Sequence, residues 1–166
     1  MPPRVVLVGA MGAGKTTVGR ELARAWDVEL RDTDHDIEAA AGKPVQDIFV
    51  DEGEAHFRSL ERAAVAAALA EHDGVVSLGG GAVLDPDTQV LLKDQTVVFL
   101  RVGFDAAMKR VGSGEGRPLL LGNARSRVKA LLEERTPVYE SVASLVVDTD
   151  DRTPDQIATE IEERLA

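Results

Sequence analysis

The chain has 166 residues, a formal net charge of −10 and no cysteine, which suits one domain over residues 1–166 and excludes disulfides and thiolate metal sites. Its acidic balance disfavours a nucleic-acid surface, because binding to a phosphate backbone normally needs a basic face. No apolar run approaches the roughly 20 residues that span a bilayer, so we expect a protein that binds neither nucleic acid nor a membrane.

The first predicted element is a strand at Val5–Val8 that begins almost at the amino terminus. It leaves no room for a signal peptide, and a cytoplasmic location is the expectation. The strand leads directly into residues 9–16, which read Gly-Ala-Met-Gly-Ala-Gly-Lys-Thr and match the G-x-x-x-x-G-K-[ST] pattern, and a helical pattern follows over residues 15–26.

This loop predicts phosphate binding. Its glycines let the backbone curl so that successive N–H groups face one point, and the following helix directs its positive end at the same place. Lys15 can then reach the β and γ phosphates of ATP, and the Thr16 hydroxyl can bind Mg²⁺. The alternative, a glycine-rich turn with a surface lysine, does not explain why the apolar strand ends at Gly9.

A weaker apolar run at Val28–Leu30 predicts a second strand, and it is followed by Asp32 and Asp34. Residues two apart in an extended chain project to the same side, so we expect the two carboxylates to point together. The ligand crevice of an open α/β sheet lies beyond the carboxyl ends of the strands, which places both acids near the phosphates. One can hold a magnesium-bound water and the other a substrate hydroxyl. For Asp34, capping of a helix N-terminus is an equally open interpretation.

The rest of the chain alternates helical patterns with apolar runs. Further strands are predicted at Val75–Leu78, Thr96–Val102 and Ser144–Val147, and further helices at 34–41, about 45–50, 53–71, about 86–93, 104–111, 124–134, 136–143 and 154–165. The strands are apolar at consecutive positions, which indicates that helices cover both of their faces. We therefore predict the α/β class, as a three-layer α/β/α sandwich with about five parallel strands.

Two arginines and a run of glycines are further candidates for anion binding. Arg58 lies one turn before Glu61, where a surface ion pair is the plain interpretation. Gly79–Gly81 follow a buried strand, so bare backbone N–H groups can approach an anion there. Together with Arg135, they would suit a small carboxylate, which a guanidinium binds through two parallel hydrogen bonds.

The segment from Gly112 to Gly116 contains three glycines in five positions. Such a segment forms no packed element, and we expect it to be mobile. A surface linker would also fit this composition. Because Arg117 follows directly in a protein that handles phosphate, we favour a lid that closes over a nucleotide.

In combination, these motifs make the chain resemble the shikimate kinases over nearly its whole length. The resemblance rests on the phosphate-binding loop, Asp32-x-Asp34, Ile48-Phe49, Gly53-Glu54-x-x-Phe57-Arg58-x-x-Glu61, Ser77-x-Gly79-Gly80-Gly81, Arg117-Pro118-Leu119 and Arg135-x-Pro137-x-Tyr139. It implies a nucleoside-monophosphate-kinase-like P-loop kinase fold with strand order 2-3-1-4-5, a shikimate-binding region near 33–61 and a mobile lid near 112–124.

The resemblance also implies transfer of the γ-phosphoryl group of ATP to the 3-hydroxyl of shikimate, on the route to chorismate and the aromatic amino acids. ATP and Mg²⁺ would be the cofactors, shikimate the small-molecule partner, and a monomer the expected state. Lys15, Asp34 and Arg117 would be catalytic, and Thr16 and Asp32 would hold the metal. The nucleotide would contact Gly12, Ala13, Gly14, Lys15, Thr16, Thr17, Arg110, Arg117, Arg152 and Pro154. Shikimate would contact Asp34, Arg58, Gly79, Gly80, Gly81 and Arg135.

Two other functions stay open on the sequence alone. A gluconate kinase would share the loop and the fold but would not need Asp34, Arg58, the glycine run and Arg135 together. A nucleotide-binding regulatory module would be expected to lack Lys15, Asp34 or Arg117, and all three are present.

Overall fold

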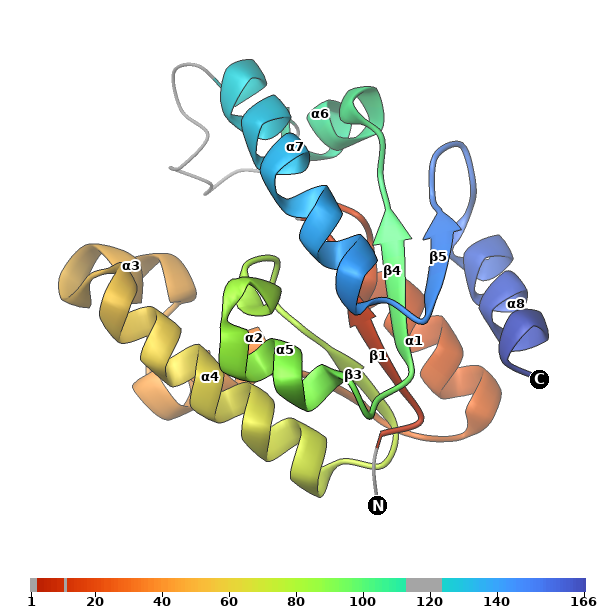
Figure 1. The fold of residues 1–166 in the computed structure, drawn as a ribbon, viewed down its shortest axis with the longest axis horizontal. Helices are drawn as coiled ribbons and strands as arrows, with labels where there is room; N and C mark the ends of the chain where they lie inside the picture. Colours follow the sequence, from red (N-terminus) through yellow and green to blue (C-terminus); the bar gives the residue numbers. More distant parts are fainter. Residues whose placement is uncertain (1–2, 11, 113–123) are drawn as a thin grey trace.

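A five-stranded parallel sheet with helices on both faces forms the centre of the computed structural model, which describes residues 3–10, 12–112 and 124–166 (Figure 1). The strands, in the spatial order β2-β3-β1-β4-β5, are β1 (Val5–Val8), β2 (Leu30–Asp32), β3 (Val75–Ser77), β4 (Val97–Arg101) and β5 (Leu145–Asp148). The helices are α1 (Lys15–Trp26), α2 (Thr33–Ala41), α3 (Val45–Glu52), α4 (Glu54–Glu71), the short 3-10 helix η1 (Ala82–Leu84), α5 (Pro86–Leu92), α6 (Phe104–Gly112), α7 (Ala124–Val142) and α8 (Pro154–Leu165). The predicted sandwich and its strand order are confirmed.

The sheet is apolar on both faces because each face carries its own hydrophobic cluster. In β1, Val5 and Leu7 belong to the cluster that packs against α1 and α8, and Val6 and Val8 belong to the cluster that packs against α4, α5 and α7. All four side chains are buried. The continuous apolar run of the sequence therefore reflects alternate residues that serve two layers, as expected for a covered parallel sheet.

A third, smaller cluster holds α2, α3 and α4 together beside the sheet. It is centred on Ile37, Ile48 and Phe57, one from each helix. The rings of Phe49 and Phe57 lie 4.5 Å apart between centroids. This cluster fixes the part of the chain that carries Asp34 and Arg58 relative to the β2–β3 edge.

Two segments differ from the sequence prediction. We predicted a strand at Val28–Leu30, but β2 begins only at Leu30. The Val28 N–H donates to the Ala23 carbonyl in the turn that closes α1 and is therefore not available to the sheet. The predicted break between helices 124–134 and 136–143 is also wrong, since α7 runs through Pro137. Proline removes a backbone donor and favours a kink, but Val138 and Val142 pack against the core beyond it and keep that half of the helix in place.

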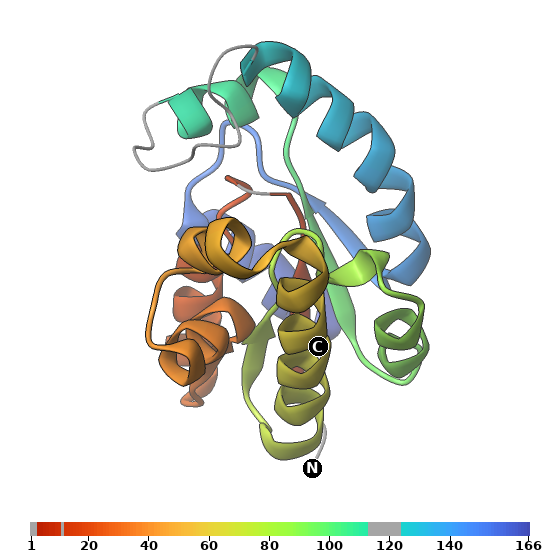
Figure 2. The ribbon, with the colours of Figure 1, turned by 90° about the vertical axis from the view of Figure 1, so that its left-hand side faces the viewer.

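Figure 2 shows α6 and the first half of α7 above the carboxyl ends of the strands, with α2, α3 and α4 in front of them. No helix within the described residues is both long and apolar enough to cross a bilayer. The predicted lid region near 112–124 falls almost entirely outside the described residues.

Replacing Leu22 with alanine should lower the free energy of unfolding by about 2–5 kcal/mol, because a buried leucine loses its packing in the cluster under α1. Leu22 is 0% exposed, whereas Val90 on α5 is 60% exposed. Val90→Ala is the control, with an expected change within about 0.5 kcal/mol. Urea denaturation of both variants measures the difference, and equal effects would contradict the assigned core.

Candidate functional site

The phosphate-binding loop lies between β1 and α1, where the strand cannot continue. Gly14 is the N-cap of α1 in the left-handed region, with φ 90°. A Cβ added at Gly9 would lie 2.7 Å from the Leu100 carbonyl oxygen of β4, so the loop leaves the sheet through a passage that only glycine fits. The Lys15 ammonium donates to the carbonyls of Gly9 and Ala10, at 2.7 and 3.1 Å, and therefore lies against the loop.

Thr16 and Asp32 bring a hydroxyl and a carboxylate together next to this loop. Thr16 Oγ1 donates to Asp32 Oδ2 over 3.3 Å, and the other oxygen, Asp32 Oδ1, accepts from the Asp34 N–H at 2.9 Å. Both are hard oxygen ligands of the kind that Mg²⁺ prefers. No group of three or more acidic, histidine or cysteine side chains suited to a metal occurs in the described ranges. A cation that keeps water and phosphate oxygens in its shell fits this small ligand set.

The two-residue spacing predicted that Asp34 continues the strand beside Asp32, and this prediction is wrong. Strand β2 ends at Asp32, which is itself the N-cap of α2, and Asp34 is the second residue of that helix. The alternative prediction, that Asp34 caps the helix, is therefore also wrong. Both carboxylates still line the same cavity, because the cap bond turns the chain sharply at the end of the strand.

The pKa of Asp34 is raised to about 6, first by burial and then by the neighbouring charges of Asp32 and Glu61, while Lys15 opposes the shift. The buried Asp34 Oδ1 has no hydrogen-bond partner within the described residues. A Cβ added at Gly79 would lie 2.7 Å from this oxygen, so the glycine backbone approaches the carboxylate closely. A buried acceptor with an open lone pair is suited to a hydroxyl donor from a ligand.

Arg58 and Glu61 form an ion pair of 2.7 Å on α4, but it is not the surface pair that their spacing suggested. Glu61 is only 3% exposed. Burial raises the pKa of Glu61, and the Arg58 guanidinium opposes that change. A Cβ added at Gly81 would lie 2.6 Å from two nitrogens of Arg58, so this guanidinium packs directly on the glycine run.

Arg135 approaches the same place from α7. Its buried Nε has no hydrogen-bond partner within the described part of the chain, and its charge acts on both Glu61 and Tyr139. A buried guanidinium nitrogen is costly to leave without an acceptor. Arg58, Arg135 and the glycine run therefore converge as donors around one point that suits an anion.

A single cavity of about 920 Å³ joins the loop to this arginine pocket. Among its lining residues are these predicted ones: Gly12, Gly14, Lys15, Thr16, Thr17, Asp32, Asp34, Arg58, Gly79, Gly80, Gly81 and Arg135. Ala13, also a predicted contact, is a buried residue of the loop itself. The cavity is large enough to hold two small ligands side by side.

The sequence interpretation missed several residues of the cavity. Arg127 lines it from α7, two turns before Arg135 and with Leu131 between them. This spacing of four and eight residues places the three side chains on one stripe of a helix, which is the signal that identifies Arg127. Phe49 and Val50 of α3 also line the cavity, and Val50 is 78% exposed.

Two of the residues predicted to flank adenine, Arg152 and Pro154, lie near the start of α8. Arg152 donates to the carbonyl of Asp148 at 2.9 Å and forms an ion pair of 2.6 Å with Glu160, which ties it to α8. Pro154 is the first residue of α8 after the Thr153 cap. Neither belongs to the lining of the large cavity within the described residues. Arg110 belongs to α6, although its side chain is outside the described part, and Arg117 lies outside the described residues altogether.

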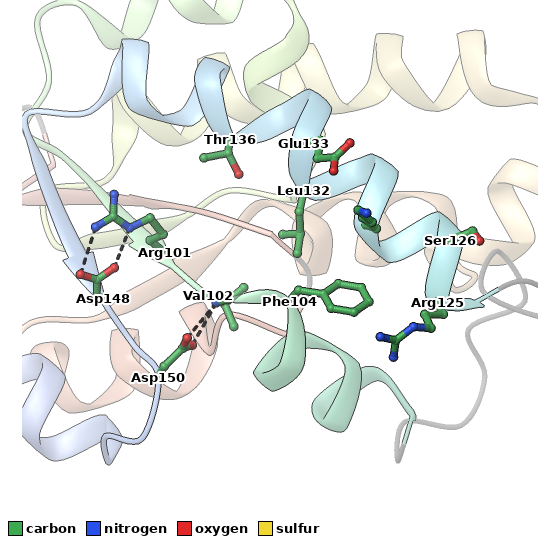
Figure 3. Close-up of a pocket in the computed structure, with 12 residues that line it drawn as sticks. Arg101, Val102, Phe104, Arg125, Ser126, Leu132, Glu133, Thr136, Asp148 and Asp150 are labelled. Atoms are coloured by element: carbon green, nitrogen blue, oxygen red, sulfur yellow. Dashed lines mark hydrogen bonds and ion pairs between the residues drawn. The ribbon is translucent and has the colours of Figure 1, made fainter.

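A second cavity, of about 810 Å³, opens on the other side of α7 (Figure 3). The Arg101–Asp148 ion pair of 2.6 Å lies at one end, and at the other the Arg125 guanidinium lies 4.9 Å from the ring centroid of Phe104. Arg125 thus belongs to a different cavity from Arg127, although the two are only two residues apart on α7. The cations of α7 are divided between two sites.

Comparison with known proteins gives a consistent result. A family model described as "Shikimate kinase" matches residues 11–166. The chain is 60% identical over 161 residues to a shikimate kinase of Salinispora tropica, with 97% of this chain and 96% of that protein covered. It is 57% identical over 166 residues to the shikimate kinase of Salinispora arenicola, with 100% and 99% covered.

The fold is also similar to solved structures. A shikimate kinase from Acinetobacter baumannii in complex with shikimate superposes with a TM-score of 0.94 at 34% identity, covering 99% of this chain and 93% of that one. A shikimate kinase from Bacteroides thetaiotaomicron gives 0.90 at 32% identity, with 99% of each chain covered. A gluconokinase from Sinorhizobium meliloti gives 0.60 at 19% identity, covering 99% of this chain and 91% of that one, which shows a shared fold alone.

The pKa of Asp34 predicts how stability depends on pH. Its ordinary value of 3.8 rises to about 6 in the folded chain, so the folded state binds the proton more tightly than the unfolded state. This contribution favours folding below pH 4 and is lost as the pH rises towards and through 6. Asp34→Asn should remove this dependence on pH. The difference in the free energy of unfolding between Asp34→Asn and wild type should therefore shift in favour of the variant by up to about 3 kcal/mol from pH 4 to pH 7, since one pKa unit corresponds to about 1.4 kcal/mol.

Urea unfolding of wild type and Asp34→Asn at pH 4 and pH 7 measures this difference. Asp87→Asn is the control, because that carboxylate is exposed on α5. A wild-type profile that runs parallel to the Asp34→Asn profile would contradict the unusual environment of the carboxylate.

Proposed function

The chain belongs to the shikimate kinase family, and we propose that its large cavity is where it transfers the γ-phosphoryl group of ATP to the 3-hydroxyl of shikimate, giving shikimate 3-phosphate and ADP. It is an ATP-dependent phosphotransferase with an alcohol acceptor, which serves chorismate and aromatic amino acid biosynthesis. The observation that supports this location is the single cavity lined by both the phosphate-binding loop and the arginine pocket.

On the nucleotide side, the N–H groups of the loop and the positive end of α1 would hold the phosphates. Lys15 would leave its loop carbonyls for the β and γ phosphates and stabilise the charge of the transferring group. Thr16 and, through water, Asp32 would hold Mg²⁺, which when bound neutralises phosphate charge. Arg127, on the same cavity wall, would add a cation close to the phosphates.

On the acceptor side, Arg58, Arg135 and the backbone of Gly79–Gly81 would bind the shikimate carboxylate. The ion pair with Glu61 fixes the Arg58 guanidinium against the glycine run, so the pocket is arranged before the ligand arrives. Preorganisation of this kind lowers the entropy cost of binding.

Asp34 lines the cavity and lies near both of its halves, because Lys15 of the loop and Glu61 beside the arginine pocket both act on its pKa. Its open Oδ1 would accept a hydrogen bond from the reacting hydroxyl and aim the oxygen at the γ phosphorus. Because the transition state of phosphoryl transfer is loose, orientation matters more than base strength, and a carboxylate with a pKa of about 6 is ionised for this task near neutral pH. The predicted roles of Arg110, Arg117, Arg152 and Pro154 at adenine and the lid stay proposals on the family resemblance.

We further propose that the protein acts as a monomer in the cytoplasm and binds no nucleic acid. One chain contributes the loop and the arginine pocket of the cavity, so no second copy is needed to complete either. The absence of cysteine suits a reducing compartment without requiring it, and the net charge of −10 opposes association with a phosphate backbone.

A coupled ADP-release assay across shikimate, quinate, gluconate and nucleoside monophosphates tests the function. We expect turnover with shikimate and little or none with the others. Quinate carries an additional hydroxyl on the carbon that bears its carboxylate, gluconate is an open chain, and a nucleoside monophosphate has no carboxylate for the arginine pocket. Lys15→Met should abolish ADP release while the protein stays folded, since the transferring phosphoryl group loses its main protein cation. Preference for gluconate or a nucleoside monophosphate would overturn the assignment.

Replacing Arg135 with alanine should raise the KM for shikimate about 10- to 150-fold and change the KM for ATP much less. A charge-assisted hydrogen bond to the carboxylate is worth about 1.5–3 kcal/mol, and the nucleotide does not use this residue. Arg125→Ala is the matched control, because Arg125 is on the same helix but lines the other cavity. Equal damage to both KM values, or an equal effect of Arg125→Ala, would count against the arginine pocket.

A further inference from the structure

Tyr139, the only tyrosine of the chain, connects the core to the glycine run of the cavity. Its side chain is 0% exposed and is the largest of the fully buried ones. Its ring lies 5.0 Å from that of Phe99, between centroids. Its hydroxyl donates to the carbonyl oxygen of Gly80 at 2.5 Å. This short bond reaches from the hydrophobic cluster on one face of the sheet to a residue that lines the cavity.

The bond determines the direction of another group, the Gly81 N–H. A trans peptide is planar, so the carbonyl of one residue and the N–H of the next point in opposite directions. When Tyr139 holds the Gly80 oxygen towards the core, the Gly81 N–H must point away from the core. Gly81 lines the cavity, and its backbone lies against the Arg58 guanidinium.

The Gly80 and Gly81 N–H groups donate to no acceptor among the described residues. A glycine–glycine peptide has little intrinsic preference for one orientation, because neither residue has a Cβ to restrict it. An external anchor is therefore needed to keep the donor aimed at one place. Tyr139 supplies it through the hydrogen bond from its hydroxyl to the Gly80 carbonyl. Burial raises the pKa of this hydroxyl, while the Arg135 side chain also interacts with it and lowers the pKa to a smaller extent.

We propose that Tyr139 is a positioning residue that fixes the Gly80–Gly81 peptide so that the Gly81 N–H donates to the carboxylate of the bound acceptor. This inference rests on the proposed function of the same cavity. Tyr139 itself does not touch the substrate. It acts through the Gly80–Gly81 peptide, and the residue that contacts the carboxylate beside Arg58 and Arg135 is Gly81.

Tyr139→Phe tests this role, because phenylalanine keeps the ring in the core and removes only the hydroxyl. We expect the Kd for shikimate, measured by calorimetry, to rise about tenfold, with the Kd for ADP and the melting temperature nearly unchanged. Tyr139→Leu, which also loses the ring, should lower the melting temperature as well. Ser141→Ala is the matched control on α7, since that hydroxyl donates at 2.7 Å to a carbonyl outside the cavity, that of Val138.

A second measurement uses the presence of a single tyrosine. Protein grown with 3-fluorotyrosine carries fluorine at position 139 alone, and fluorine makes the phenol a stronger hydrogen-bond donor. Shikimate binding should therefore keep or gain affinity, and the ¹⁹F resonance should shift on addition of shikimate but not of ADP. This measurement decides the question even if Tyr139→Phe fails to fold.

The outcomes separate this role from the proposed function. An unchanged shikimate Kd in folded Tyr139→Phe, an equal loss of ADP affinity, or a ¹⁹F resonance that does not respond to shikimate would overturn the role of Tyr139. A wild-type chain that releases no ADP with shikimate would instead overturn the proposed function.

Discussion

Parallel pairing of β1 with both β3 and β4 is the constraint on which the site depends. The register aligns Leu7 with Ser77 and Val8 with Phe99, so the chain leaves all of these strands at the same edge of the sheet. In a parallel sheet that edge collects segments that are far apart in sequence. Three segments meet there because of the strand pairing itself: the phosphate-binding loop after β1, Asp32 at the end of β2 and the glycine run after β3.

Charge balance inside the cavity follows from this convergence. An acidic chain must hold two anionic ligands, and it does so by directing a few cations inward while acids keep them in position. Glu61 costs free energy to bury, and its ion pair with Arg58 offsets that cost. Asp34 differs, because burial and the charges of Asp32 and Glu61 outweigh the effect of Lys15, and its pKa rises. The same burial that makes this carboxylate costly to ionise also keeps its Oδ1 available to accept a hydrogen bond from a ligand hydroxyl.

Local patterns in the sequence were sufficient for the covered parallel sheet and the phosphate-binding loop, whereas the strand order and the full set of acid-binding residues were predicted from the family resemblance. Continuous apolar runs indicated covered strands, and the glycine-lysine loop has a strong signature of its own. The errors lie where tertiary contacts overrule local preference. Asp32 takes the cap that was also considered for Asp34, and Pro137 stays inside a helix that is packed on both sides of it. Glu61 of the Arg58–Glu61 pair is buried, although its spacing from Arg58 suggested a surface pair. Spacing alone does not reveal which face of α4 meets the glycine run.

The glycines after β3 show how substitutions at positions far apart in the sequence can depend on each other. The space that a methyl group would need at Gly79 is occupied by the Asp34 carboxylate, and the corresponding space at Gly81 by the Arg58 guanidinium. Neither glycine is required by its own backbone angles, since neither has a positive φ. Enlarging position 81 or 79 would therefore displace the guanidinium of Arg58 or the carboxylate of Asp34 from its place in the cavity. Remodelling this pocket for a larger or uncharged acceptor is simplest when the charged side chain is replaced first, because its removal leaves room for a side chain at the facing glycine.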